Sequence, residues 1–182
     1  MIRIGMLRFA AAIAILSFPA AASANTSDCH VDTAERDHAR TLDWQTFDQE
    51  GGYPGTFREL SKDRCFASAF NAYVDWMQNG KGFSNDRERG IGTFHMGQSL
   101  AFIGRTNDAV ALFKRSFREE SLSDPNAAEW NLYVSGVLAF FAEDRKAIGA
   151  ALKELDAIGT RAAMQWSERL KGLRRCIREP YA

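Results

Sequence analysis

Apolar residues recur along this chain at three- and four-residue steps, the spacing that places side chains on one face of an α-helix. No alternating apolar and polar run of a length typical of a β-strand is present in the sequence. The pattern therefore predicts an all-α fold with six or seven helices. The helical runs lie between Phe57 and Met77, Asn85 and Ile103, Ala109 and Phe117, Trp130 and Phe141, Ala147 and Leu155, and Ala163 and Ile177.

Capping and breaking residues mark several of the helix boundaries. Asn85 precedes Glu88 by three residues, a spacing at which the two side chains cap a helix start reciprocally. Asp124 followed by proline predicts another helix start, and Gly159 predicts a helix end. The turn at 62–64 divides the first run into a short helix and a longer one.

The sequence predicts three segments: a signal peptide at 1–24, a polar N-terminal arm with a short helix at 25–55 and a helical domain at 56–182. Leu42, Trp44 and Phe47 mark the short helical or turn-rich piece of the arm. The leader carries two arginines, an apolar run and a closing Ala-Ser-Ala, so we expect cleavage after Ala24. Its apolar run is shorter than the ~20 residues that span a bilayer, so we expect no membrane span after cleavage and a periplasmic or secreted protein. The polar residues 25–40 are interpreted as an extended arm or a frayed helix.

Charge and composition narrow the classes of partner. The chain has 23 basic and 23 acidic residues, and removal of the leader with its two arginines gives a net charge of about −2. A dense basic face of the kind that binds nucleic acid is not expected. Because 46% of the residues are apolar, the chain can bury a substantial core.

Three cysteines, Cys29, Cys65 and Cys176, would enter an oxidising compartment on export. They allow three single disulfides, each of which leaves one cysteine over. A bridge from Cys29 would tie the N-terminal arm to a helix. A bridge between Cys65 and Cys176 would staple the two ends of the helical domain, and we favour this second pairing.

The middle of the chain resembles a tetratricopeptide repeat, a pair of helices that stacks on similar pairs. Ala69, Ala109 and Ala147 recur with a period near 40 residues, which indicates stacked repeats. The matching residues are Met96, Gly97, Leu100, Gly104, Ala109, Phe113 and Ser116. The resemblance implies a short right-handed stack of helical hairpins, with the last helix as a cap. It also implies a partner-binding groove lined by Phe94, Gln98, Asn131 and Ser135.

Candidate chemistry is sparse. His30 and His38, with Cys29 and the nearby aspartates, form the one cluster that resembles metal ligands, but a closed zinc site needs a second, distant pair of ligands. His95 lies in the middle repeat without a neighbouring nucleophile in the sequence. We therefore assign no catalytic residue, no metal and no cofactor.

These observations rank three functions. The first is a non-enzymatic exported protein that binds a protein or peptide partner in the cell envelope, or serves as a scaffold there. The alternative is a periplasmic small-molecule or metal-binding protein, with a hydrolytic activity as one version, that uses His95 or the His30 and His38 arm. The third is a structural role in which the repeats stack on copies of themselves.

Overall fold

The structure, a computed structural model, describes residues 29–122 and 124–181 and is all-α, which confirms the predicted fold class. Within these ranges there are eight α-helices and one π-helix, with no strand beyond an isolated bridge between Ser121 and Asp124. None of the described helices is both long enough and apolar enough to cross a bilayer. The expected signal peptide, residues 1–24, lies outside the described residues.

The first part of the chain forms α1 (Thr33–Thr41), η2 (Gln45–Glu50), α2 (Phe57–Lys62) and α3 (Phe66–Asn79). The π-helix η2 and the short α2 pack together, and α1 lies against α3. These elements share one aromatic-rich core, which spreads as far as α4. Its largest buried side chains are Trp44, Phe47, Phe57, Leu60, Tyr73, Trp76 and Met96.

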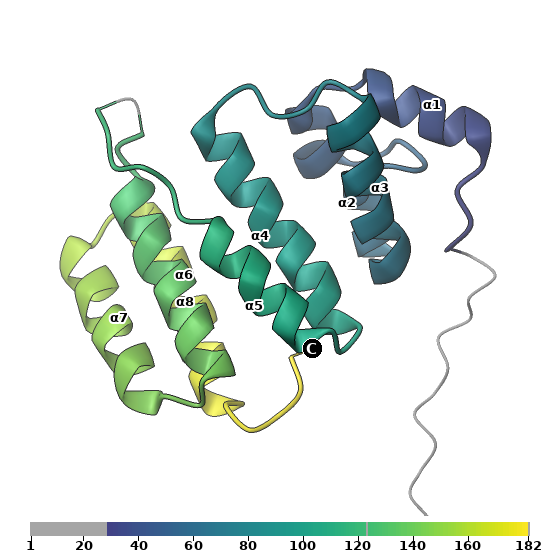
Figure 1. Ribbon diagram of the computed structural model, residues 1–182. Helices are drawn as coiled ribbons and strands as arrows, with labels where there is room; N and C mark the ends of the chain where they lie inside the picture. Colours follow the sequence, from purple (N-terminus) through teal and green to yellow (C-terminus); the bar gives the residue numbers. More distant parts are fainter. Residues whose placement is uncertain (1–28, 123, 182) are drawn as a thin grey trace, which may run out of the picture.

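The second part forms α4 (Asp86–Phe102), α5 (Thr106–Arg115), α6 (Ala127–Phe141), α7 (Arg145–Ile158) and α8 (Arg161–Arg175). Figure 1 shows α4 with α5, and α6 with α7, as neighbouring helical hairpins, while α1 to α3 lie on the other side of α4. The last helix, α8, packs on both α6 and α7, the position expected of a capping helix. A stack of hairpins is compatible with this arrangement, and its right-handed, tetratricopeptide-like geometry stays a prediction.

Glycines allow the closest helix contacts in the stack. A Cβ atom at Gly97 would lie 2.8 Å from Cε1 of Phe113, and one at Gly136 would lie 2.5 Å from Cδ1 of Leu170. Both neighbours are fully buried, so they have little room to move. The two glycines therefore bring α4 against α5 and α6 against α8.

Most of the predicted helix boundaries agree with the structure. The turn at 62–64 separates α2 from α3, the side chain of Asn85 accepts a hydrogen bond from the Glu88 amide (2.9 Å), and Gly159 ends α7 in the left-handed conformation. The helix start predicted at Asp124 is wrong, since α6 begins at Ala127. Asp124 instead lies 3.2 Å from the buried guanidinium of Arg118, which holds it outside the helix.

For residues 29–40, the interpretation as an extended arm or frayed helix is corrected by α1, while residues 25–28 lie outside the described residues. The first turn of α1 has a reciprocal cap: the Asp32 side chain accepts from the Glu35 amide (2.8 Å), and the Glu35 side chain accepts from the Asp32 amide (3.0 Å). Ala39 is buried against α3, where a small residue lets the two helices approach. A polar helix is stable here because it is capped and docked.

The favoured disulfide between Cys65 and Cys176 is also wrong, because Cys29 is bonded to Cys65. Cys176 is exposed and free. Cys65 precedes α3, and Cys29 precedes α1, which packs on α3, so the docking of α1 brings the two cysteines together. The bridge therefore fixes the start of the described chain to α3.

Candidate functional site

The four residues predicted to line a partner groove have different surroundings. Phe94 is 2% exposed and packs between Phe113 and Trp130 in the core, so it is not available to a partner. Asn131 bonds the main-chain N and O of Arg118 (2.9 Å each), which fixes the linker before α6. The side-chain amide of Asn131 is therefore already hydrogen-bonded within the protein.

Gln98 and Ser135 remain accessible to a partner. The exposed Ser135 hydroxyl donates to the carbonyl of Asn131, one helical turn earlier (2.8 Å). Gln98 is partly buried on α4, and its Nε2 donates to the hydroxyl of Tyr181 (2.9 Å). The structure thus connects Gln98 to a residue that the sequence had not placed near the groove.

Tyr181 follows α8 and inserts its ring among four phenylalanines from three helices. These four residues, Phe102, Phe113, Phe140 and Phe141, are called the phenylalanine cage. The ring centroid of Tyr181 lies 5.2 Å from that of Phe102, 5.4 Å from that of Phe141 and 5.9 Å from that of Phe140. Figure 1 shows the segment after α8 turning back to the ends of α4 and α5.

The ring of Tyr181 anchors the end of this segment, and the buried side chain of Ile177 anchors its start. Pro180 has no amide hydrogen, and the Tyr181 main chain makes no hydrogen bond in the part of the chain that the structure describes. Burial raises the pKa of the Tyr181 phenol, so the hydroxyl stays protonated and neutral at ordinary pH. An aromatic ring with one hydrogen bond at its tip is therefore the group that the cage accepts.

A pocket of about 460 Å³ continues from the phenylalanine cage along α8. Gln98 and Tyr133 line it from α4 and α6, and Arg169 and Leu173 line it from α8. We call this pocket together with the phenylalanine cage the tyrosine groove. It presents apolar walls with a few polar groups, as ligand sites in proteins commonly do.

A second arrangement joins His95 of α4 to the π-helix. Nδ1 of His95 lies 2.8 Å from Oδ1 of Asp48, whose side chain is fully buried, and the imidazole stacks on Phe57. Arg58 approaches the same carboxylate at 3.8 Å and donates to the Asp48 carbonyl. A hydrogen bond from His95 to an ionised Asp48 carboxylate, which only accepts, would place the imidazole proton on Nδ1.

This pair has the orientation of a general base, but general-base catalysis also needs a reacting group within reach. No Ser, Cys or Thr side chain is bonded to His95 among the described residues. The chemistry visible here is structural: a buried carboxylate ties η2 to α4 and α2. This pair could not be predicted from the sequence, since its members are 47 positions apart.

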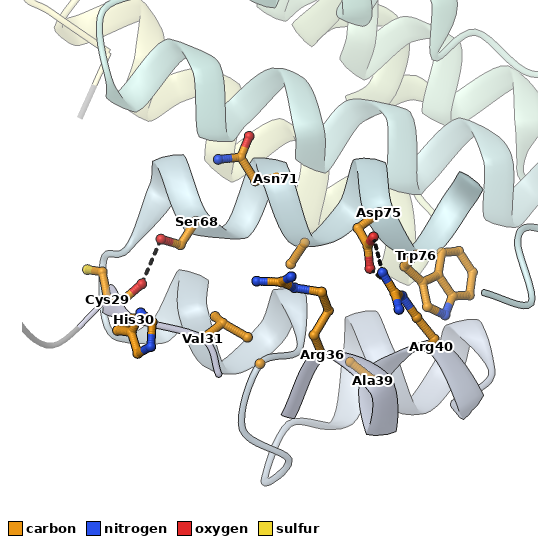
Figure 2. Close-up of a pocket in the computed structure, with 12 residues that line it drawn as sticks. Cys29, His30, Val31, Arg36, Ala39, Arg40, Ser68, Asn71, Asp75 and Trp76 are labelled. Carbon is orange, nitrogen blue, oxygen red and sulfur yellow. Dashed lines mark hydrogen bonds and ion pairs between the residues drawn. The ribbon is translucent and has the colours of Figure 1, made fainter. Parts of the chain in front are cut away.

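A cleft of about 400 Å³ lies between α1 and α3 (Figure 2). Cys29, His30 and Val31 form one end, and the other end is closed by Arg40 and Asp75. Two hydrogen bonds, of 2.8 and 2.7 Å, join the Arg40 guanidinium to the Asp75 carboxylate. The Arg40 hydrogen bond lowers the pKa of Asp75, so the acid is charged and paired.

Unlike Arg40, Arg36 forms no ion pair among the described residues. Figure 2 shows its guanidinium directed into the cleft, below Ser68 and Asn71 of α3. The Ser68 hydroxyl donates to the Cys29 carbonyl (2.8 Å). Neither Arg36 nor Asn71 has a side-chain hydrogen bond or an ion pair to any residue that the structure describes. The cleft therefore holds a cation and an amide that can bind a ligand.

The metal-ligand candidates of the sequence are separated in space. Cys29 is in the disulfide, His30 lines the cleft, and His38 packs against Tyr53 with their ring centroids 5.7 Å apart. Over residues 29–122 and 124–181 no group of three or more potential ligands gathers. A version of the alternative function that needs these histidines together has no support in this arrangement.

Comparisons with protein-family models, with curated proteins and with solved structures each found no match. The resemblance to tetratricopeptide repeats therefore rests on the residues quoted from the sequence. The candidate sites rest on the geometry described above.

Proposed function

We propose that this chain is an exported, non-enzymatic helical protein that binds an extended segment of another protein in the tyrosine groove. The observation that carries this proposal is the seating of Tyr181 in the phenylalanine cage, with its hydroxyl bonded to Gln98. The seated side chain defines the chemistry of the ligand: an aromatic ring with a hydroxyl at its tip.

In this proposal the segment that follows α8 stands in for the partner. A tethered segment competes at a high effective concentration, on the order of millimolar for a short flexible link. A partner must therefore displace Tyr181 before it binds. Such a segment keeps four phenylalanines covered until a partner arrives, which limits unwanted association through an apolar patch.

Export to the periplasm or beyond belongs to the same proposal, with a partner in the cell envelope. Two observations support it: the leader-like sequence at 1–24 and the disulfide between Cys29 and Cys65. Disulfides persist in oxidising compartments and are uncommon in the cytosol.

The test is a peptide titration of two chains followed by NMR. One is the full chain and the other ends at Glu179, so that Ile177, which is buried at 4% exposure, keeps its contacts. The probe is the peptide Ile-Arg-Glu-Pro-Tyr-Ala, the sequence of residues 177–182. We expect the shortened chain to bind at least about tenfold more tightly than the full chain, with shifts of the Gln98 side-chain amide.

The control peptide carries alanine in place of tyrosine and is expected not to bind. If the shortened chain is folded by circular dichroism and binds neither peptide, the proposal is wrong. Equal binding of the two peptides would also overturn it, because the cage would then play no part.

A further inference from the structure

The cleft between α1 and α3 is lined by two arginines, one that forms ion pairs with described residues and one that does not. Arg40 is held by Asp75 and by Asp37 (2.7 Å), whereas Arg36 makes no ion pair within 4 Å among the described residues and acts on Asp75 only by longer-range attraction. An arginine needs no carboxylate at a protein surface, since water solvates it. Arg36 and Asn71 are both exposed at the mouth of the cleft, and Figure 2 shows the guanidinium of Arg36 directed into the cleft below Asn71.

The charges around the cleft favour a single negative charge. Asp75 in the lining and Asp37 outside it both pair with Arg40, so Arg36 is the arginine of the lining that is left without an ion pair among the described residues. The planar guanidinium fork matches the two oxygens of a carboxylate. A phosphate monoester, with a charge of about −1.5 to −2 near neutral pH, would meet repulsion from Asp75 without a second free cation.

The rest of the lining is apolar or small. Trp76 and Ala39 are buried at the base, and the cleft volume of about 400 Å³ falls near the lower end for small-ligand sites. Such a space accepts a group of the size of one amino acid. The remaining apolar or small lining residues are Val31, Gly55 and Ala72.

We infer that the α1–α3 cleft binds a carboxylate that is attached to a small apolar group. Arg36 forms the ion pair with the carboxylate, and the Asn71 amide bonds a neighbouring polar atom of the ligand. This site shares no residue with the tyrosine groove, so the inference is tested independently of the proposed function.

The experiment is a calorimetric titration of the oxidised full chain with N-acetyl-leucine and, separately, with N-acetyl-leucine amide. The acid is expected to bind at least tenfold more tightly than the amide, because only the acid carries the charge that Arg36 pairs. Equal affinities, or no heat and no NMR shift with either compound, would overturn the inference. Inorganic phosphate is a third probe, and tighter binding of phosphate than of the acid would also overturn it.

Two substitutions place the binding at this cleft. Arg36→Gln is expected to weaken binding of N-acetyl-leucine at least tenfold, and Asn71→Ala several-fold. Arg145→Gln is the matched control, since Arg145 is exposed at the start of α7, away from the lining. An unchanged affinity in Arg36→Gln, or an equal loss in Arg145→Gln, would contradict the assignment.

The same titration distinguishes the source of the carboxylate. If the tripeptide Gly-Ala-Leu binds more tightly than N-acetyl-leucine, the cleft recognises the carboxyl end of a peptide. If the two bind alike, the ligand is a free small acid. Either result requires that Arg36→Gln removes the binding, which keeps the test tied to the cleft.

Discussion

Nδ1 of His95 lies 2.8 Å from Oδ1 of Asp48, and this contact joins helix α4 to a π-helix whose sequence has little helical pattern of its own. The carboxylate of Asp48 is fully buried, with Gln49, Arg58 and the Tyr73 hydroxyl as its other polar neighbours. A buried charge that loses a partner is costly because water cannot replace it.

Replacing His95 by leucine is therefore expected to lower the free energy of unfolding by about 3 kcal/mol, measured by urea denaturation. The matched control is His38→Leu, a histidine exposed on α1 whose ring packs against Tyr53. That change is expected to stay within about 0.5 kcal/mol. If the free energy of unfolding falls by a similar amount in the two variants, the contact between His95 and Asp48 does not contribute more to stability than the control contact.

The disulfide between Cys29 and Cys65 closes a loop across 36 positions. Loss of a crosslink of this span is expected to destabilise the chain by about 3–4 kcal/mol, mainly by freeing the unfolded chain. The comparison is a denaturant curve of Cys29→Ser/Cys65→Ser against Cys176→Ser, which should match the original chain. A non-reduced digest should link Cys29 with Cys65, and a peptide joining Cys65 to Cys176 would contradict the structure.

The ion pair between Arg40 and Asp75 makes stability depend on pH. The Arg40 hydrogen bond lowers the pKa of Asp75 below its ordinary value of 3.8. Its stabilisation is thus complete above that value and is lost as the pH falls through the lowered pKa of the folded state. Arg40→Gln should reduce stability at neutral pH, with a difference that shrinks in acid; a difference independent of pH would contradict this account.

At Gly97, helix packing and helix propensity predict opposite effects of an alanine substitution on stability. Alanine favours a helix over glycine by about 1 kcal/mol, yet a Cβ at Gly97 would lie 2.8 Å from the buried ring of Phe113. We expect Gly97→Ala to destabilise the chain by about 1–3 kcal/mol in thermal unfolding. At Gly149 the nearest atom would be 3.8 Å away, so Gly149→Ala should stabilise slightly. A stabilising Gly97→Ala would refute the packing argument.

The helices from α2 onward were predictable because their apolar residues recur with a helical period and their ends carry caps such as Asn85 and Gly159. The start of α1 was also readable, since Asp32 and Glu35 have the spacing of a capping box. The helix α1 was nevertheless not predicted, because its residues are mostly polar. A short helical or turn-rich piece was predicted around Leu42, Trp44 and Phe47, where η2 lies, but its π-helical form could not be predicted, because docking against α2 and not a local pattern holds it.

The candidate sites depended on contacts between distant parts of the chain. The resemblance to tetratricopeptide repeats implied that Gln98 lines the groove, but it implied the same for Phe94, whose ring lies in the core. It could not show that Tyr181 returns to Gln98, 83 positions earlier. Likewise, the free side chain of Arg36 is defined only by the pairing of Arg40 with Asp75, which needs the docked position of α1.

The central claim is that the tyrosine groove recognises a tyrosine side chain, and the Gln98 hydrogen bond tests it most directly. In the chain that ends at Glu179, peptide Ile-Arg-Glu-Pro-Tyr-Ala is compared with its phenylalanine analogue, before and after Gln98→Leu. A neutral hydrogen bond contributes about 1 kcal/mol, so we expect about a fivefold preference for tyrosine that Gln98→Leu abolishes. A preference that survives Gln98→Leu, or an absence of binding by both peptides, would contradict the account.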